Sequence, residues 1–459
     1  MKKIITLLII ISLALVVSAC SPQTSSKDEA DVLIIGGGGA GLVAAIEAAK
    51  TGKKVILVEK MPALGGNTII SATGITASDT IYHQESGISF TKEDHFNRTM
   101  STSKDLANGE LVRILVDESA SAVSWLKELG VTLKVRSEAE PFWLVPVEGH
   151  YGAQLVAAFV AEANKYSNLE IRTNTKATKL VVDNGTVIGA EVQNNEKTYT
   201  IKSKSVVLAT GGLNNNPEMI AYYNEKYANI HTQMTTPGAT GDGITMALEV
   251  NAELVDMEFF QVRPLSSNGN WYHERIISTE DISGILINRE GVRFTNETAA
   301  PRTVASEILK QSDSLAYIIF DQRVLDTHAD AKKAFTIGRG EKADTIAELA
   351  QLIGVDGATL DATVNAYNEG KDSFNRTVLG KILEGPFYAV KTLPSNHYTM
   401  GGLKVNELAQ VINKSGQVIP GLYAAGEVMG GLYGDGRVAG NNTLDDIVFG
   451  KIAGYNAAQ

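Results

Sequence analysis

The chain has 459 residues, of which 44% are hydrophobic, and 41 lysines and arginines against 52 aspartates and glutamates give a net charge of −11. This acidic balance, with no basic cluster, argues against a nucleic-acid partner. The single cysteine, Cys20, excludes an internal disulfide, a cysteine-held metal or iron–sulfur cluster and c-type haem attachment, and no metal site is predicted.

The first 20 residues have the layout of a bacterial secretory signal. Two lysines precede an apolar stretch at residues 4–17, and its 14 residues are short for a membrane span. The sequence VSAC at the end of this stretch resembles a lipobox, in which Cys20 becomes the lipid-modified first residue of a mature lipoprotein; the alternative is an ordinary cleaved signal. Residues 21–30 are predicted to form a polar tether. We therefore expect a soluble body that is lipid-anchored to the cell membrane and faces outside, extracellular or periplasmic.

The first motif of the body covers residues 31–60. An apolar strand at residues 32–35 leads into Gly-x-Gly-x-x-Gly at residues 36–41, an alanine-rich helix follows, and a second strand at residues 55–58 ends in Glu59. Glycines in this order allow a tight turn and bring a helix N-terminus against a pyrophosphate, while the acid is placed to bind a ribose. The strand, glycines, helix, strand and acid together predict a dinucleotide site.

The rest of the chain alternates between helical and strand-like patterns. Apolar residues recur every three or four positions over residues 110–131, which predicts a helix. Strand-like runs at residues 169–173 and 186–192 precede VVLATGG at residues 206–212. Over residues 257–380 the pattern changes to charged helices and short strands, and nucleotide-site motifs then resume. This order predicts a discontinuous α/β domain that carries an insertion.

Four motifs, GGNT at residues 65–68, SATG at 71–74, VVLATGG and GLYAAGEVMGG at 421–431, resemble the FAD-binding segments of the fumarate reductase and succinate dehydrogenase flavoprotein family. The likeness covers nearly all the chain after residue 30 and is greatest to the soluble fumarate and urocanate reductases. It implies an α/β fold, with a Rossmann-type FAD-binding domain in two parts, residues 31–256 and 381–459. An α+β capping domain that binds substrate is expected at residues 257–380.

The resemblance also implies FAD as the cofactor. Glu59 would hold the adenosine ribose, the segment from Gly65 to Gly74 would pass along the flavin, and Glu427 would bind the ribityl chain. Relatives in membrane complexes attach FAD through a histidine in this segment, and its absence here implies non-covalent FAD. The full set of implied cofactor-binding residues is Gly36, Gly38, Gly39, Ala40, Gly41, Glu59, Lys60, Gly65, Gly66, Asn67, Thr68, Ala72, Thr73, Gly74, Ala209, Thr210, Gly211, Gly212, Asp242, Gly426, Glu427, Arg437, Gly440, Asn441, Thr443 and Leu444.

The resemblance places one substrate carboxylate against Arg437, in GDGRVAGN, and His397, in SNHYTMGG. A guanidinium offers a planar pair of donors that matches a carboxylate. The far carboxylate would lie near Gln261 and Thr279, but Arg263 in MEFFQVRPL stands where fumarate reductases have a histidine. This replacement puts fumarate itself in doubt as the substrate.

The expected reaction transfers hydride from N5 of reduced FAD to the β-carbon of an α,β-unsaturated carboxylic acid. Arg437 and His397 would polarise the acid, and Arg302 in the capping domain would protonate the α-carbon. Glu280 resembles the first acid of the family's proton relay, whereas the relay's second arginine has no counterpart here. Electrons are expected from an external donor, such as a flavinylated or haem-containing membrane protein.

Two other functions stay open on the sequence. One is the reverse chemistry, in which a dehydrogenase or oxidase introduces a carbon–carbon double bond. The other is a surface flavoprotein that carries electrons without catalysing a reaction.

Overall fold

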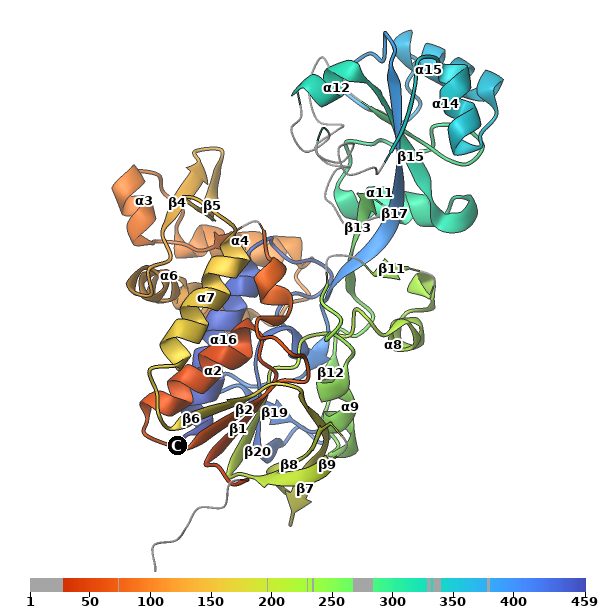
Figure 1. The fold of residues 1–459 in the computed structure, drawn as a ribbon. Helices are drawn as coiled ribbons and strands as arrows, with labels where there is room; N and C mark the ends of the chain where they lie inside the picture. Colours follow the sequence, from red (N-terminus) through yellow and green to blue (C-terminus); the bar gives the residue numbers. More distant parts are fainter. Residues whose placement is uncertain are drawn as a thin grey trace, which may run out of the picture.

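The structure is a computed structural model that describes residues 28–72, 74–195, 197–228, 230–232, 235–266, 284–327, 332, 340–377 and 380–459. It has a larger part, called the body here (residues 28–256 and 400–459), and a smaller part, called the cap (residues 284–390), which stand apart in Figure 1. Two antiparallel strands, β13 (Phe260–Ser266) and β17 (Phe387–Thr399), connect the body with the cap.

The body is built on a six-stranded sheet with the order β19-β20-β10-β1-β2-β6. Its strands are β1 (Val32–Ile35), β2 (Val55–Val58), β6 (Leu169–Arg172), β10 (Ser205–Leu208), β19 (Gln410–Ile412) and β20 (Val418–Ala424). All neighbours are parallel except β19 and β20. Every residue of β1 and β2 is buried, as expected for strands covered on both faces. The two strands predicted around the glycine motif are thus confirmed.

The glycine motif forms the turn between β1 and helix α2 (Gly39–Lys50). Gly36 has φ +109°, and a Cβ atom there would lie 2.2 Å from the carbonyl oxygen of Ala209. A Cβ atom at Gly41 would lie 1.9 Å from the carbonyl oxygen of Gly36. Neither site has room for a side chain, so these glycines let the helix start directly against the sheet.

Helix α2 packs along α16 (Asn441–Ala457), and α7 (Tyr151–Ala163) lies beside them in the same layer (Figure 1). The contact between α2 and α16 is close because it is made by small residues. Cβ atoms at Gly450 and Gly454 would lie 2.9 Å and 2.2 Å from the carbonyl oxygens of Ala40 and Ala44. This packing holds the N-termini of both helices at one edge of the body.

The region predicted as one helix over residues 110–131 is two helices, α5 (Gly109–Asp117) and α6 (Ser119–Glu128). They meet at Glu118, which has φ −87° and ψ −2° and caps both helices. The apolar pattern continues across this break because both helices bury one face in the same core. The single long helix was therefore wrong.

The remaining elements of the body form smaller units. A twisted three-stranded sheet contains β7 (Thr175–Asp183), β8 (Thr186–Asn194) and β9 (Lys197–Lys202). Another contains β3 (Ile75–Thr76), β5 (Glu140–Pro146) and β4 (Leu133–Ser137), and β12 (Leu254–Val255) pairs with β18 (Gly402–Leu403). The other helical elements of the body are η1 (Gly66–Ile70), α3 (Ile81–Ser86), α4 (Lys92–Thr102), α8 (Pro217–Tyr223), η2 (Glu225–Tyr227), α9 (Asp242–Glu249) and η4 (Gly426–Val428).

The cap is built on a second sheet, in which β17 pairs with β13, β15 (Ala316–Asp321), β16 (Glu341–Ala343) and the short β11 (His231–Thr232), while β14 (Ile285–Ile287) pairs with β15. The helices among its described residues are α11 (Pro301–Leu309), η3 (Ser312–Ser314), α12 (Gln322–Thr327), α14 (Ile346–Ile353) and α15 (Gly357–Asn368). Two hydrophobic clusters fill the cap and are distinct from the core of the body, which Ala305 of α11 also joins.

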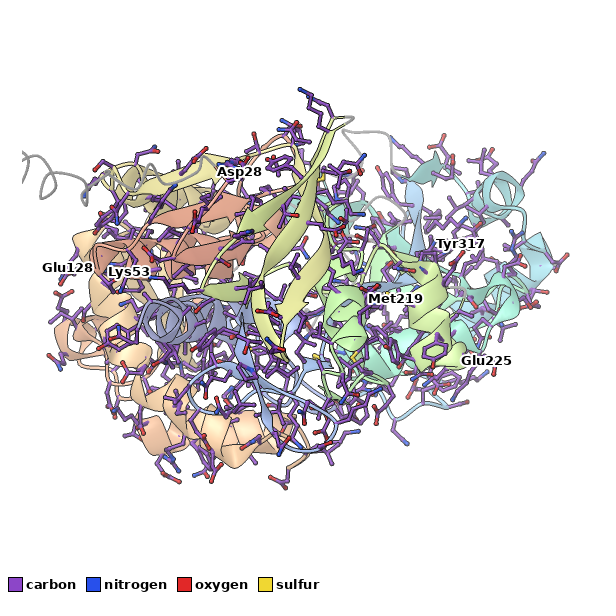
Figure 2. All side chains as sticks on the ribbon, turned by 90° about the horizontal axis from the view of Figure 1, so that it is seen from below. Asp28, Lys53, Glu128, Met219, Glu225 and Tyr317 are labelled. Atoms are coloured by element: carbon purple, nitrogen blue, oxygen red, sulfur yellow. The ribbon has the colours of Figure 1, made fainter. Side chains whose placement is uncertain are left out.

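Seen from below, the body and the cap lie side by side (Figure 2). Asp28 and Lys53 mark the body, and Tyr317 marks the cap. In the parts of the chain that the structure describes, no helix has the length and apolar character needed to span a membrane. The same residues contain no cluster of histidine, cysteine and carboxylate side chains that could hold a metal ion.

Candidate active site

A cavity of about 860 Å³ extends through the body to the base of the two connecting strands. Its walls come from the start of α2, from η1, from the β4–β5 hairpin, from residues 236–242 and from the loop that leads into α16. Arg263 of β13 and His397 and Tyr398 of β17 close one end of it. Ligand pockets range from about 300 to 1,000 Å³, so this cavity suits a large ligand.

The N-terminus of α2 opens into the cavity at Gly38 and Gly39. A Cβ atom built at Gly38 would meet only the Cα atom of Gly66, 4.0 Å away. Unlike Gly36 and Gly41, Gly38 therefore faces open space. The backbone N–H groups and the positive end of the helix dipole make this a place where a pyrophosphate can approach closely.

Glu59 and Lys60 follow β2 and line the cavity beside the glycine turn. The Glu59 carboxylate accepts hydrogen bonds from the backbone N–H groups of Gly37 and Met61, both at 2.7 Å. Lys60 Nζ lies 2.7 Å from Asp242 Oδ2, and this contact, with other basic groups, outweighs the effect of burial and lowers the pKa of Asp242. Two backbone bonds thus fix the Glu59 side chain beside the glycine turn.

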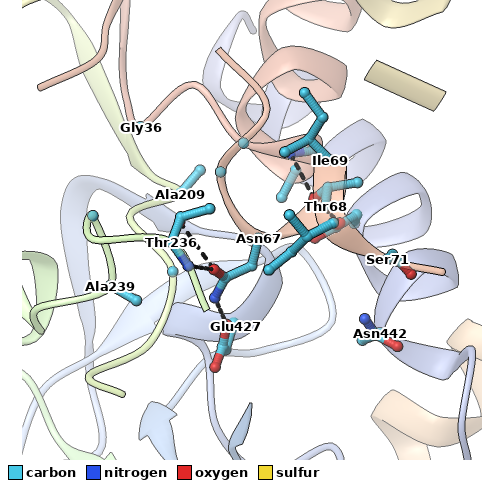
Figure 3. Close-up of a pocket in the computed structure, with 18 of the residues that line it drawn as sticks. Gly36, Asn67, Thr68, Ile69, Ser71, Ala209, Thr236, Ala239, Glu427 and Asn442 are labelled. Carbon is cyan, nitrogen blue, oxygen red and sulfur yellow. Dashed lines mark hydrogen bonds between the residues drawn. The ribbon is translucent and has the colours of Figure 1, made fainter. Parts of the chain in front are cut away.

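Asn67 connects three segments at the middle of the cavity (Figure 3). Its Oδ1 accepts hydrogen bonds from the backbone N–H and the hydroxyl of Thr236 at 2.7 and 3.0 Å, and from the Thr235 hydroxyl at 3.1 Å. Its Nδ2 donates to Glu427 Oε2 at 3.2 Å. Glu427 Oε1 also accepts from Asn214 Nδ2 at 2.8 Å and from the Thr399 backbone at 2.9 Å. Glu427 is therefore fixed from several elements, although burial raises its pKa.

Arg437 lies in the cavity wall, in the loop before α16, and is 7% exposed. Its guanidinium donates to Asn442 Oδ1 at 2.5 Å and to Gln261 Oε1 at 2.6 Å, and it lies 4.4 Å from the centre of the Tyr398 ring. Within the described parts of the chain its Nε has no hydrogen-bond acceptor, and no carboxylate pairs with the group. A buried cation that is held only by neutral groups favours the binding of an anion.

His397 and Arg263 lie near Arg437 in the cavity wall. Burial, followed by the positive charges of Arg263 and Arg437, lowers the pKa of His397 well below its ordinary value. The imidazole is therefore neutral at pH 7. Arg263 lies on β13 opposite Ser395 of β17. The three groups place two permanent positive charges and a neutral histidine around one end of the cavity.

The structure brings most of the predicted site residues to this cavity. Those in its wall are Gly36, Gly38, Gly39, Ala40, Glu59, Lys60, Gly66, Asn67, Thr68, Ala72, Ala209, Thr210, Gly211, Asp242, Arg263, His397, Glu427, Arg437 and Gly440. Others are not part of the wall, namely Gly41, Gly65, Gly74, Gly212, Gln261, Arg302, Gly426, Asn441, Thr443 and Leu444. Thr73, Thr279, Glu280 and Cys20 lie outside the described residues.

Several residues outside the wall support residues in it. Gln261 accepts a hydrogen bond from Arg437, and a Cβ atom at Gly212 would lie 2.5 Å from Glu427 Oε1. Arg302, in the first turn of α11, donates hydrogen bonds to the backbone oxygen and to the carboxylate of Asp435. Arg302 is therefore held at the loop that carries Arg437, and its guanidinium does not line the cavity.

The sequence motifs did not reveal two further features of the wall. Asp446 of α16 accepts a hydrogen bond from Thr68 Oγ1 at 2.8 Å, and a Cβ atom at Gly39 would lie 2.5 Å from its Oδ2. Trp143 of the β4–β5 hairpin stacks under Arg136 at 4.5 Å, and its Nε1 finds no acceptor among the described residues. The position of Asp446 within the buried run NNTLDDIVFG was a sequence signal that could have revealed it. No local sequence pattern marked Trp143.

Comparison with known proteins identifies the chain's family, because residues 31–444 match the family described as "FAD binding domain". The chain belongs to this family. The cytochrome-type fumarate reductase of Shewanella frigidimarina is 36% identical, over 95% of this chain and 78% of that protein. The urocanate reductase of Eggerthella lenta is 34% identical, over 95% and 76%. The open conformation of a flavocytochrome c3 fumarate reductase has a TM-score of 0.87 at 34% identity, covering 94% and 78%. The family, the α/β fold and FAD as cofactor, all predicted from the motifs, are confirmed.

The residues of the cavity fit FAD in this FAD-dependent oxidoreductase. The open space at Gly38 and the N-terminus of α2 suit the pyrophosphate, and Glu59 beside that turn suits the ribose. Asn67 and Glu427 supply fixed polar groups farther along the cavity. Arg263, His397 and Arg437 then form the end that is left for a second, anionic ligand.

Proposed function

We propose that the protein reduces an α,β-unsaturated carboxylic acid. The observation that carries this proposal is the environment of Arg437, a buried guanidinium with amide partners and no carboxylate partner among the described residues. The carboxylate of an acid would supply the missing negative charge and accept two parallel hydrogen bonds. The names of the relatives support the same class of substrate, since fumarate and urocanate are both unsaturated acids.

The residues around Arg437 suit such an acid. Neutral His397 can donate one ring N–H to a carboxylate or accept a proton, and its tautomer follows from that contact. Arg437 draws electron density from the conjugated double bond toward the carboxylate and stabilises the negative charge that develops on it during reduction. Bound FAD, when reduced, supplies the hydride.

Arg302 is the proposed donor of the proton that completes the reaction. Its guanidinium is bonded to Asp435, two residues before Arg437, and does not line the cavity in this structure, so proton transfer requires it to move toward the bound acid. An arginine is a weak acid, with a pKa above about 12 in solution, so it serves only where a strongly basic carbanion forms next to it and its proton is quickly replaced.

Arg263 is the residue that separates this site from one built for fumarate. It is longer than a histidine and always charged, so it reaches farther and favours a second anionic or strongly polar group. We propose a substrate whose second polar group differs in position or charge from the second carboxylate of fumarate.

The test is a screen of the dithionite-reduced protein, freed of excess reductant, against fumarate, urocanate, acrylate and aromatic propenoic acids. We expect one of them to reoxidise the flavin rapidly, as seen in its absorbance. Arg437→Met should keep FAD but lose about 2–5 kcal/mol of transition-state binding, which is roughly 30-fold to a few thousandfold in kcat/KM.

Other outcomes of the screen separate the remaining functions. Reduction of oxidised flavin by saturated acids would indicate a dehydrogenase. A flavin that reacts with no acid in either direction would indicate an electron carrier. The assignment of Arg437 fails if Arg437→Met keeps near-native kcat/KM on the acid that the screen identifies.

The protein is also proposed to act outside the cytoplasmic membrane, held by lipid at Cys20. The support is the sequence of residues 1–30 alone. Electrons would then come from a flavin- or haem-containing membrane protein, and reduction of the acid would end an electron-transfer chain.

A further inference from the structure

Asp435 connects the proposed proton donor with solvent. It belongs to the loop before α16, and its two carboxylate oxygens bind different cations. Oδ1 accepts a hydrogen bond from Arg302, and Oδ2 lies 2.5 Å from Lys104 Nζ. In the described parts of the chain, the side-chain hydrogen bonds of Arg302 go to Asp435 alone. One carboxylate is thus shared between a cap residue and a body residue.

The middle group of this row of charges, Asp435, is the most buried, and the outer group, Lys104, is the most exposed. The side chain of Asp435 is 10% exposed, that of Arg302 is 36% exposed, and that of Lys104 is 69% exposed. Burial alone would raise the pKa of Asp435, but the hydrogen bonds from Arg302 and Lys104 lower it below the ordinary value. Asp435 is therefore ionised at neutral pH and can hold a proton only briefly as it passes to a stronger base, while the exposed Lys104 is in contact with water.

We propose that Asp435 positions Arg302 and returns a proton to it after each turnover. This inference rests on the proposed reduction of an unsaturated acid. In that reaction Arg302 gives an N–H proton to the substrate carbanion and becomes a neutral guanidine. Lys104 gives a proton to the Asp435 carboxylate, the resulting carboxylic acid gives a proton to the guanidine, and Lys104 takes a proton from water. The cycle consumes one proton from solvent, and all three side chains regain their starting charges.

The arrangement also explains how Arg302 stays near Arg437, a group of the same charge. Two guanidinium groups at one loop repel each other, and a carboxylate that binds one of them weakens this repulsion. Asp435 supplies that carboxylate and ties α11 of the cap to the body. The sequence-predicted relay acid, Glu280, lies outside the described residues, and Asp435 provides a route that does not depend on it.

The experiment compares Asp435→Asn and Asp435→Glu with the full-length, FAD-loaded protein, using the acid found in the screen. An asparagine keeps a hydrogen-bond acceptor for Arg302 but carries no negative charge and passes no proton. We expect Asp435→Asn to lower kcat at least about tenfold, within the range of general acid–base effects, while KM changes less than about threefold. Flavin reduction by dithionite should be unchanged, and the solvent deuterium isotope effect on reoxidation should increase. Asp435→Glu should recover most of the lost rate.

Two controls separate the relay from a structural role. Asp31→Asn removes an ion-pair carboxylate of the body, the partner of Lys204 at 2.8 Å, and should leave kcat unchanged. Lys104→Met should lower kcat less than Asp435→Asn, because water can replace an exposed donor. The proposal is overturned if Asp435→Asn keeps kcat within twofold, or if its rate falls without a change in the isotope effect and Asp435→Glu does not restore it. If the wild-type protein reduces no unsaturated acid, the proposed function itself fails, and the relay fails with it.

Discussion

At the scale of single residues, Asp446 is the least expected group in the cofactor cavity. It belongs to α16 and faces the start of α2, where its carboxylate contacts Thr68. Thr68 Oγ1 in turn accepts a hydrogen bond from the Gly39 backbone at 3.0 Å. Burial, together with the charge of Glu427, raises the pKa of Asp446 to about 7, although hydrogen bonds from Thr68 and Ala40 and the charge of Arg437 oppose the rise. Asp445 on the same helix also has a raised pKa, again mainly from burial.

FAD affinity is therefore expected to decrease as pH rises above about 7. The diphosphate is negative, so its arrival at the α2 N-terminus raises the pKa of Asp446 further, and the bound state holds more protons than the free protein. Affinity then falls between the pKa of the free protein and the higher pKa of the complex, by at most about tenfold per pH unit for one proton. Titration of the apoprotein with FAD, followed by flavin fluorescence from pH 6 to 9, measures this slope.

Asp446→Asn should flatten that profile and bind FAD more tightly than the wild-type protein at pH 8. Asp361→Asn, at an exposed position of α15 in the cap, is the matched control and should keep the wild-type slope. An Asp446→Asn profile as steep as that of the wild type would assign the proton to another group, such as Glu427 or Asp445.

The residues at the end of the cavity that would bind an anion were predictable, because each of them lies within a short sequence motif that can be recognised on its own. Arg437, His397 and Arg263 lie far apart in the chain, and the structure brings all three to one wall. The partners of Arg437, Gln261 and Asn442, could be seen only after folding, since a hydrogen bond between residues 261 and 437 leaves no local pattern. The contact of Arg302 with Asp435 was hidden for the same reason.

At the scale of elements, the contact between α2 and α16 fixes the cofactor cavity. Both helices begin at its wall, so a change in their separation moves Gly39 and Gly440 relative to each other. The closest approach is at Gly454, where a Cβ atom would lie 2.2 Å from the carbonyl oxygen of Ala44. A backbone atom cannot turn away as a side chain can.

We expect Gly454→Ala to destabilise the protein, although alanine favours helix more than glycine by about 1 kcal/mol. Overpacking should cost about 1–3 kcal/mol and lower Tm by about 1 °C for each kcal/mol in a chain of this length. Tyr455→Ala, at a neighbouring position that is 55% exposed, should change Tm far less. Differential scanning calorimetry of the FAD-loaded variants gives both values, and a Gly454→Ala protein with raised Tm would show that the helices separate without cost.

The sequence patterns predicted some of the strands and helices correctly but missed a break between two helices. Strands at residues 32–35 and 55–58 were predictable because short apolar runs around a glycine turn have one common arrangement. The break between α5 and α6 at Glu118 was not predictable. Both helices bury their apolar faces in one core, so the apolar periodicity continues across the break. A break that keeps the same face buried leaves the sequence pattern intact.

At the scale of the whole molecule, the body and the cap meet through few elements. Strands β13 and β17 connect them, and the pair between Arg302 and Asp435 adds a polar contact across the same boundary. The long β17 belongs to the cap sheet at its start and reaches the cavity at His397 and Tyr398. A rotation of the cap would therefore change the end of the cavity around Arg263 and His397 more than the end proposed for FAD, which the body builds alone.

Anchoring of the whole molecule by lipid depends on Cys20, the only cysteine in the chain. Cys20→Ser should abolish incorporation of labelled palmitate and move the protein from the detergent phase to the aqueous phase in Triton X-114 partitioning. Thr24→Ala, in the tether, is the control and should partition as the wild type does. FAD content should be the same in all three proteins, because the cavity is built from residues 35–446. Because no other residue offers a thiol for the lipid, labelled palmitate that persists in Cys20→Ser would exclude this anchor.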